Sequence, residues 1–522
     1  MRKTAITTYE MLDYFVRVSG DKPALKQDDR MLTYAQWQKK ALQVANALAA
    51  AGIGAGDRVA MLTYNRIEQF VILYATMKLG AVYVPVNYRL AAGEIKYILN
   101  QSEAKAIIVD DDDELGGKID SIAGETGLAT FIKIGVKCTQ PGHWQSFESF
   151  IADAPATAID FEPLPETPVY QMYTSGTTGF PKGVMVTQQQ SAAFVVHALW
   201  VPPRVDAGKP HLAVAPIFHA GALCSSLMAL CAGRPVVILK DFNPLQFVET
   251  IVNEEISDVM VVPAMLLAIL QYVPNLDQYD FSKVEKIIYG ASPITVDVLE
   301  RSMAAFGCQF QQGFGMTELV ASATALTADD HNKAVNGRPE LLRSCGRAGL
   351  FVDLKIVNPE THEEMAVGEI GEIVLRAPHV MEGYSKQPDK TAEVLDEDGW
   401  YYSGDGGYVD EEGYVYIKDR IKDMIVSGGE NVYPAEVENA LMSHPDITDV
   451  AVIGLADDKF GESVVAICVP AQSAEIDAEA MVDHCRERIA GYKIPRRYEC
   501  VEQLPRNPSG KLLKRELREQ FT

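Results

Sequence analysis

The sequence predicts an α/β protein with a large amino-terminal domain and a small α+β carboxy-terminal domain. Three observations lead to this class: the length, an alternation of strand-like and helix-like segments, and a change of pattern after about residue 335. At 522 residues the chain exceeds what one hydrophobic core usually serves, so more than one folding unit is expected. Apolar residues make up 48% and charged residues 23%, which suits well-packed cores.

Apolar runs of strand length alternate with helical patterns through the first part of the chain. Residues 57–65 have the pattern of a strand and 67–80 that of a helix, and such pairs recur along the sequence. This alternation is typical of mostly parallel sheets covered by helices. We therefore expect two related α/β layers, over about 1–165 and 166–335.

The rest of the chain changes in character twice. Short strands separated by Gly, Pro and acidic turns fill 336–419, which predicts an antiparallel β-rich unit that completes an amino-terminal domain over 1–419. A hinge is expected at 420–422. Beyond it, 423–522 should form a small mobile α+β domain whose first helix begins at Pro434.

Charge and cysteine usage exclude several classes of protein. A net charge of -24 repels nucleic acid, so we expect no nucleic-acid partner. The eight cysteines include no Cys-x-x-Cys pair, which argues against a disulfide framework or a zinc site and favours a reducing compartment. Gly, Arg and Pro interrupt the apolar stretches, so we expect a cytoplasmic protein without a transmembrane segment. Peripheral contact with a membrane stays open.

The segment YTSGTTGFPKG at 173–183 has the residue types of a phosphate-binding loop. Its hydroxyl groups can donate hydrogen bonds, its glycines let backbone amides approach an anion, and Lys182 adds a positive charge. The loop is not a Walker A motif, because the lysine is followed by glycine and then by another strand-like run. A kinase of that class is therefore excluded.

This segment resembles the phosphate-binding motif of the acyl-adenylate-forming superfamily, which includes acyl-CoA synthetases, adenylation domains of peptide synthetases and beetle luciferases. Further matches follow in the family's order over nearly the whole chain: APIFHAGAL at 215–223, YGASP at 289–293, GFGMTE at 313–318, YYSGDGGYV at 401–409, KDRIKDMIVSGGENVYPAEVE at 418–438 and PRNPSGKLLKREL at 505–517. The resemblance implies a two-step reaction: a carboxylate and ATP give acyl-AMP and pyrophosphate, and a thiol then displaces AMP.

The resemblance also assigns roles to residues of the nucleotide site. Lys511 would bridge the carboxylate and the α-phosphate, Thr178 and Lys182 would hold the departing phosphates, and Glu318 would bind Mg²⁺, which prefers oxygen ligands. The other nucleotide-binding residues that it implies are Thr174, Ser175, Gly176, Thr177, Gly179, Gly290, Ala291, Ser292, Gly313, Phe314, Gly315, Met316, Thr317, Asp405 and Arg420. Of these, Asp405 and Arg420 would hold the ribose.

The same resemblance implies a hinge, a thiol channel and an acyl pocket. Rotation at Lys422 would withdraw Lys511 after adenylation and present a glycine loop to the thiol. The expected channel for coenzyme A consists of Ser427, Gly428 and Gly429. The expected acyl pocket, with His219 as a catalytic gate, consists of His219, Ala220, Gly221, Gly290 and Gly315.

The sequence leaves several substrates open. Small residues after His219 and the absence of the tryptophan that resembles the stop of acetate-specific members favour a medium- to long-chain fatty acid. An aromatic or other bulky apolar acid is the nearest alternative. The chain ends at Thr522 without a carrier domain, so we expect free coenzyme A, with a carrier protein in trans as a rival acceptor. An adenylate-binding protein without turnover is the non-enzyme alternative, and a homodimer is left open.

Overall fold

The computed structural model describes residues 6–135, 143–174, 181–202, 204–292, 294–427, 430–457, 460–471, 474, 476–486, 488–506 and 512–522, with only the backbone of 419, 420, 422, 426, 430 and 431. The chain divides into two compact units, which are described separately. One unit runs to Asp353 and takes in Arg376–Tyr401, and the other comprises Leu354–Leu375 and Tyr402–Thr522.

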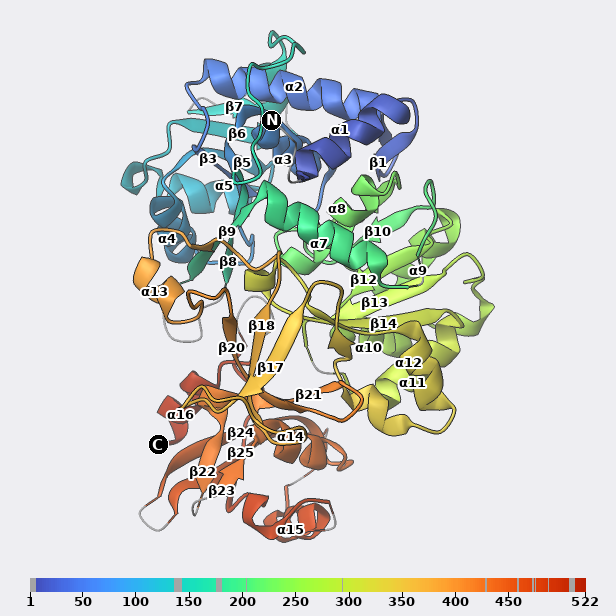
Figure 1. Ribbon diagram of the computed structural model, residues 1–522, viewed down its shortest axis with the longest axis vertical. Helices are drawn as coiled ribbons and strands as arrows, with labels where there is room; N and C mark the ends of the chain where they lie inside the picture. Colours follow the sequence, from blue (N-terminus) through green and yellow to red (C-terminus); the bar gives the residue numbers. More distant parts are fainter. Residues whose placement is uncertain are drawn as a thin grey trace. The chain divides into compact units, whose positions relative to one another are not determined.

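An eight-stranded sheet in the first unit has the order β19-β9-β8-β4-β3-β5-β6-β7 (Figure 1). The strands from β8 to β7 run parallel, whereas β9 pairs antiparallel with both β8 and β19. The bounds are β3 Arg58–Leu62, β4 Val82–Pro85, β5 Ala104–Asp110, β6 Thr130–Ile134, β7 Trp144–Ser146, β8 Pro168–Thr174, β9 Lys182–Thr187 and β19 Gly383–Tyr384.

A nine-stranded sheet in the same unit has the order β16-β15-β14-β13-β12-β10-β11-β1-β2. Its central strands from β14 to β1 are parallel, and its edges are antiparallel. The bounds are β1 Pro23–Gln27, β2 Arg30–Thr33, β10 His211–Ala213, β11 Val236–Ile238, β12 Asp258–Val261, β13 Lys286–Gly290, β14 Gln309–Phe314, β15 Thr324–Leu326 and β16 Arg347–Ala348.

The two sheets interleave along the chain rather than dividing at residue 165. β1 and β2 come from the beginning of the chain yet belong to the nine-stranded sheet, where Leu25 pairs with Val236. β8 and β9 come after residue 165 yet complete the eight-stranded sheet. The expectation of helix-covered, mostly parallel sheets is confirmed, but sequential alternation could not say which strand joins which sheet.

Helices cover these sheets, and α3 (Ile67–Leu79) is buried along its whole length. It contacts β4 and β8 of one sheet and β1 of the other. A helix that is apolar on all sides is stable only when it is surrounded in this way. The remaining helices of this unit are α1 Thr8–Val18, α2 Tyr34–Ala50, α4 Ala92–Ser102, α5 Asp113–Asp120, α6 Phe147–Ile151, α7 Gln188–Trp200, α8 Ala220–Cys231, α9 Pro244–Asn253, α10 Pro263–Tyr272, α11 Val296–Phe306, α12 Ala328–Val335 and α13 Pro388–Ala392.

The second unit contains two smaller sheets. The four-stranded sheet has the order β17-β18-β20-β21, and the five-stranded sheet has the order β23-β22-β25-β24 with β26 beside β25. Helix α14 (Pro434–Met442) begins at the predicted proline. The other elements are β17 Asp353–Val357, β18 Gly371–Arg376, β20 Tyr401–Val409, β21 Val415–Arg420, β22 Ile425–Ser427, β23 Glu430–Val432, β24 Ile447–Asp457, β25 Gly461–Pro470, α15 Ala478–Arg486, β26 Arg497–Cys500 and α16 Lys514–Phe521. The small α+β domain is thus confirmed.

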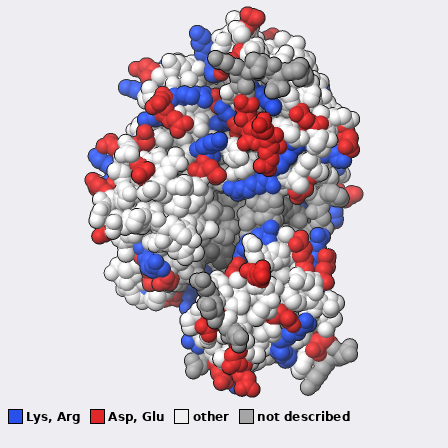
Figure 2. Space-filling model, turned by 180° about the vertical axis from the view of Figure 1, so that it is seen from behind, with Lys and Arg blue, Asp and Glu red and all other residues white. Residues whose placement is uncertain are grey.

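The surface carries both signs of charge despite the acidic total. On the face shown in Figure 2, Lys and Arg side chains are interspersed with Asp and Glu side chains. Among the described residues, none of the helices combines the length and the apolar character needed to cross a membrane.

Candidate active site

The two described ends of the predicted phosphate loop belong to the β8–β9 hairpin. Thr174, the last residue of β8, pairs in register with Lys182, the first residue of β9. The hairpin therefore holds the two ends of the loop side by side. Between them, the predicted Ser175, Gly176, Thr177, Thr178 and Gly179 lie outside the described residues.

Amide and phenol side chains fix the base of this hairpin. The Nε2 of Gln171 donates to the Oη of Tyr173 at 2.7 Å, and that hydroxyl donates to the Oε1 of Gln101. A Cβ on Gly183 would come within 2.5 Å of the Nε2 of Gln171, so only glycine fits there without a shift. The glycine after the lysine, which sets this motif apart from Walker A, thus has a packing cause.

Lys182 and Glu318 meet at one aromatic ring. The Nζ of Lys182 lies 4.1 Å from the centre of the Tyr384 ring, and the Oη of Tyr384 donates to the Oε1 of Glu318 at 2.8 Å. Burial lowers the pKa of the Lys182 ammonium, and the carboxylates of Glu318 and Glu393 oppose that effect. The structure therefore brings together the predicted phosphate lysine and the predicted metal ligand, although 136 positions separate them (318 minus 182).

Glu318 is a buried residue whose backbone is fixed by a hydrogen bond. It lies in the short 3₁₀-helix η3 (Thr317–Leu319) and is 7% exposed, and its carbonyl oxygen accepts from the backbone N–H of Met381 at 2.8 Å. Within the described part of the chain, no group of three or more His, Cys, Asp or Glu side chains is placed to hold a metal ion. A single carboxylate suits Mg²⁺, which usually takes one or two carboxylates together with substrate phosphates and water.

The carboxyl ends of β13 and β14 form an edge of small residues. Gly290 pairs in register with Gly313, and a Cβ on Gly290 would overlap the carbonyl oxygen of Gly313. Ala291 follows with a φ of 68°, and Ala291 and Ser292 are exposed. Ligands of α/β sheets bind at such carboxyl ends. The predicted adenine contact Phe314 is the last residue of β14 on the same edge.

The segment after Phe314 turns back on itself. Met316 precedes η3, and Thr317 is its first residue. A Cβ on Gly315 would overlap the backbone of Ala321 and Ser322. The space beside Gly315 is therefore filled by loop backbone, whereas the sequence led us to expect open pocket space there. The loop is supported by His379, whose Nε2 lies 3.2 Å from the carbonyl oxygen of Ser322.

The predicted acyl-pocket residues begin helix α8. His219 is the exposed residue just before this helix, and its ring lies 4.4 Å from that of buried Phe218. Ala220 is buried and Gly221 half-buried. A Cβ on Gly221 would lie 2.9 Å from the Cε of Met260, so the thioether of Met260 faces this glycine from β12. Sequence reasoning did not single out Met260.

The second unit holds the predicted ribose, hinge and thiol residues. Asp405 is 5% exposed on β20 and pairs in register with Arg420, the last residue of β21. Lys422 follows in the 3₁₀-helix η5 (Ile421–Asp423). Ser427 is buried and its Oγ accepts from the Nη1 of Arg496 at 2.9 Å. The predicted Gly428, Gly429 and Lys511 lie outside the described residues, as do the side chains of Arg420 and Lys422.

Tyr384, like Met260, is a residue of the candidate site that sequence reasoning missed. It belongs to the two-residue strand β19, where it pairs with Val184 of β9. Its segment, MEGYSKQPDK at 381–390, is polar but has no glycine-rich phosphate-loop pattern that would point to a site. Its contacts depend on chain segments that only the fold brings together.

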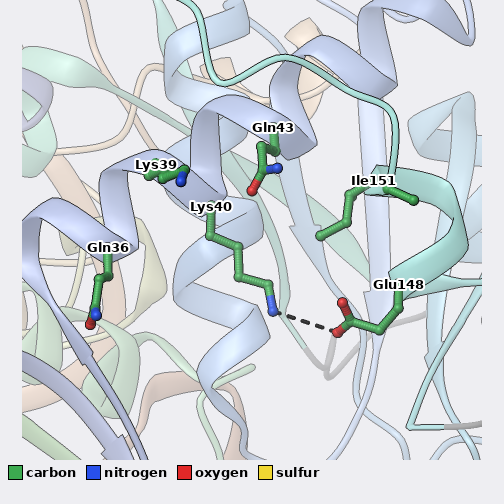
Figure 3. A pocket seen from close by; sticks show the side chains of 7 residues that line it. Gln36, Lys39, Lys40, Gln43, Glu148 and Ile151 are labelled. Carbon is green, nitrogen blue, oxygen red and sulfur yellow. Dashed lines mark ion pairs between the residues drawn. The ribbon is translucent and has the colours of Figure 1, made fainter.

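A separate hollow lies beside α2 and has a different chemistry. Figure 3 shows its lining of long polar side chains, with the Nζ of Lys40 3.5 Å from the Oε1 of Glu148. Its walls are formed by Gln36, Lys39, Lys40, Gln43, Glu148, Ile151 and Ala152. None of these is a predicted site residue. Ligand pockets are mostly apolar and enclosed, so this hollow is not a candidate active site.

Comparison with known proteins adds information on the family. The sequence model described as AMP-binding enzyme matches residues 12–385, and that described as AMP-binding enzyme C-terminal domain matches 436–511. A fatty acid–[acyl-carrier-protein] ligase from Streptomyces coeruleorubidus is 39% identical over 96% of this chain and 93% of its own. A feruloyl-CoA synthase from an Amycolatopsis species is 36% identical, with 97% of each chain covered.

A solved structure agrees in fold over nearly the whole length. The Mycobacterium tuberculosis fatty acyl CoA synthetase superposes with a TM-score of 0.75 at 33% identity, covering 99% of this chain and 98% of that one. The fold of this chain is therefore shared, over nearly its whole length, with a solved acyl-CoA synthetase.

Proposed function

Because the chain belongs to the family of AMP-binding enzymes and is an AMP-forming acid–thiol ligase, we propose that it joins an apolar carboxylic acid to coenzyme A through an acyl-adenylate. The proposed substrate is a medium- to long-chain fatty acid. The observation that carries this choice is the start of α8, where the flexible thioether of Met260 lies against Gly221. Thioethers adapt to apolar chains of varied shape.

The residues around Lys182 suit the first step of this reaction. A carboxylic acid of ordinary pKa, near 4.3, is ionised at neutral pH, so its attack on the α-phosphate needs no general base. The attack builds negative charge on the polyphosphate, and catalysis of such transfers is mainly positioning and electrostatic stabilisation. Lys182 supplies positive charge beside the loop, and we assign Lys511 to the same task at the carboxylate and α-phosphate.

We assign Mg²⁺ to Glu318, with ATP supplying the other ligands. When bound, the ion would neutralise part of the phosphate charge. We assign Asp405 to the ribose hydroxyls. Its low exposure and its place opposite Arg420 on one β ladder suit a carboxylate that is held in a fixed orientation. Rotation at Lys422 remains our proposal for the change between the two half-reactions.

Two alternatives are each favoured by one observation. An aromatic acid is favoured by the 36% identity to a feruloyl-CoA synthase. A carrier protein as the acceptor is favoured by the 39% identity to a fatty acid–[acyl-carrier-protein] ligase. Both share the adenylation step with the main proposal, so they differ only in the acid bound or in the thiol that accepts it.

Pyrophosphate release separates these proposals. The purified protein is supplied with ATP, Mg²⁺ and one acid at a time, from C2 to C18 fatty acids, benzoate and cinnamates, with and without coenzyme A. Turnover with C8 to C18 acids that coenzyme A stimulates is the expected result. Preference for cinnamates would replace the fatty acid, and release that coenzyme A leaves unstimulated would favour a carrier acceptor. No release with any acid would contradict the proposal.

A further inference from the structure

Tyr384 contacts both charged groups of the proposed phosphate site. Its hydroxyl donates to the Oε1 of Glu318 at 2.8 Å, and its ring centre lies 4.1 Å from the Nζ of Lys182. The two opposite charges thus meet the same side chain at different places, one at its hydroxyl and one at its face. Both contacts lie within one compact unit of the protein.

The backbone holds Tyr384 on both sides. Its N–H donates to the Oγ1 of Thr391 at 2.9 Å, and the next N–H, that of Ser385, donates to the carbonyl oxygen of Gly183 at 2.7 Å. Tyr384 is 4% exposed. A buried ring on a paired strand has few alternative rotamers, so its hydroxyl is a fixed donor rather than an occasional one.

Such a donor keeps the Glu318 carboxylate and the Lys182 ammonium apart. Without it, a buried carboxylate and an ammonium this close would gain by pairing with each other, and the pair would then have to separate before either could bind a ligand. The hydroxyl satisfies one carboxylate oxygen and leaves the second oxygen of Glu318 for another partner. The ring face stabilises the ammonium through the cation–π interaction.

We propose that Tyr384 is a positioning residue of this site, which holds the Glu318 carboxylate for Mg²⁺ and the Lys182 ammonium for the phosphates of ATP. This inference rests on the proposed function, because it assumes that the site binds MgATP. The hydroxyl and the ring act separately. Tyr384→Phe removes the hydrogen bond and keeps the ring, whereas Tyr384→Leu removes both.

The test is binding of a non-hydrolysable ATP analogue, α,β-methylene-ATP, measured by calorimetry over a series of Mg²⁺ concentrations. We expect Tyr384→Phe to raise the Mg²⁺ concentration for half-maximal binding about tenfold, because a hydrogen bond to a charged group is lost. Binding of AMP without metal should change less than about twofold. Tyr384→Leu should also weaken binding of the metal-free analogue, because the contact with Lys182 is lost.

Tyr34→Phe is the matched control. The Oη of Tyr34 is also buried and donates to the carbonyl oxygen of Leu230 at 2.9 Å, but it contacts neither charged group. The control should retain the wild-type Mg²⁺ dependence. In a steady-state assay, Tyr384→Phe should likewise raise the KM for MgATP more than it lowers kcat.

The possible results lead to different conclusions. An unchanged Mg²⁺ dependence in Tyr384→Phe would overturn the positioning role and leave the proposed function intact. Equal weakening of AMP and of the Mg²⁺ complex would make Tyr384 a general packing residue and would also overturn it. If the wild-type protein binds neither AMP nor the analogue, the proposed function fails and this inference fails with it.

Discussion

The two ends of the nine-stranded sheet are built from opposite kinds of residue. At the amino ends of its parallel strands, His211, Asp258 and Lys286 begin β10, β12 and β13 in register and are almost completely buried. Arg234 donates from Nη2 to Asp258 and, at 3.2 Å, to the Oγ of Ser257. At the carboxyl ends of β13 and β14 the same sheet has Gly290 and Gly313, followed after β13 by the exposed residues Ala291 and Ser292.

The comparison teaches that, in this sheet, the buried charges lie at the opposite ends of the strands from the proposed nucleotide-binding residues. Burial raises the pKa of Asp258, but His211 and Arg234 lower it more, so the carboxylate is held below its usual range. Perturbed groups often mark active sites, yet ion-pair networks produce them as well. Here the charged side chains are buried, whereas Ala291 and Ser292 at the opposite end are exposed. Ligands of α/β sheets bind at that carboxyl end of the strands.

The largest expected effect is the loss of stability caused by Asp258→Asn. The substitution leaves the buried guanidinium of Arg234 without its counter-charge, which should lower the free energy of unfolding by about 3–5 kcal/mol. Urea unfolding of the wild type and the variant measures this loss of stability. Pyrophosphate release per folded molecule should stay unchanged.

The matched control for this substitution is Asp297→Asn. Asp297 forms an exposed ion pair with Arg301 at 3.2 Å, so the change should stay within about 0.5 kcal/mol. If both variants lost a similar free energy of unfolding, the buried ion pair at the amino ends would stabilise the protein no more than an exposed one.

The second effect is on activity, from Glu318→Gln. The amide keeps an acceptor for Tyr384 but removes the charge assigned to Mg²⁺, so kcat/KM should fall by about a hundredfold, equivalent to about 2.7 kcal/mol. Unfolding in urea should change little. If Glu318→Gln instead lowered the stability and kept the specific activity, the carboxyl ends would serve stability rather than activity, and the comparison would be reversed.

The third effect tests the glycines of the carboxyl ends. Gly290→Ala places a methyl group against the carbonyl oxygen of Gly313, which should push the strands apart, cost about 1–3 kcal/mol of stability and weaken AMP binding. Gly127→Ala is the control, because a Cβ there meets nothing within 4 Å. Equal AMP affinity in wild type and Gly290→Ala, measured by calorimetry, would remove Gly290 from the nucleotide site.

The fourth effect distinguishes the two ends of the sheet by the pH dependence of stability. Burial, with help from His197, lowers the pKa of His379 to about 3. Because its folded pKa lies below the unfolded value, its stabilising contribution is complete above about pH 6.5 and is lost as the pH falls toward 3, by at most about 1.4 kcal/mol per pH unit. Asp258 also has a lowered pKa, but its contribution starts to fall only near its ordinary value of about 3.9.

Unfolding free energies between pH 7 and pH 4.5 check this last prediction. His379→Phe should make the free energy of unfolding depend less on pH in that range. Asp258→Asn should lower the free energy of unfolding at every pH in the range without changing its pH dependence. A wild-type profile that is level down to pH 4.5 would show that His379 does not remain neutral in the folded protein.

Local sequence predicted what depends on local chemistry. The residue types of its loop singled out Lys182, the family resemblance singled out Glu318, and Pro434 marked the start of a helix. The structure brings Lys182 and Glu318 to the same tyrosine ring, and the helix begins at that proline. Tyr384 could not be predicted, because its importance comes from pairing with β9 and from a contact 66 positions away. The assignment of β1 and β2 to the distant sheet was inaccessible for the same reason, since periodicity carries no information on strand partners.

The interleaving of the sheets bears on how the protein is made. During synthesis, β1 emerges more than two hundred residues before its neighbour, since Leu25 pairs with Val236. Until then only the edge of β1 that faces β2 is paired, and the opposite edge has no partner. Such long-range pairing is slow and exposes strands to aggregation. Neither large sheet can be completed before the other has begun, so a fragment ending near residue 165 should not fold independently. In the folded protein α2 packs on β1 and β2, so it is the neighbouring helix already synthesised that can cover these strands before β11 arrives.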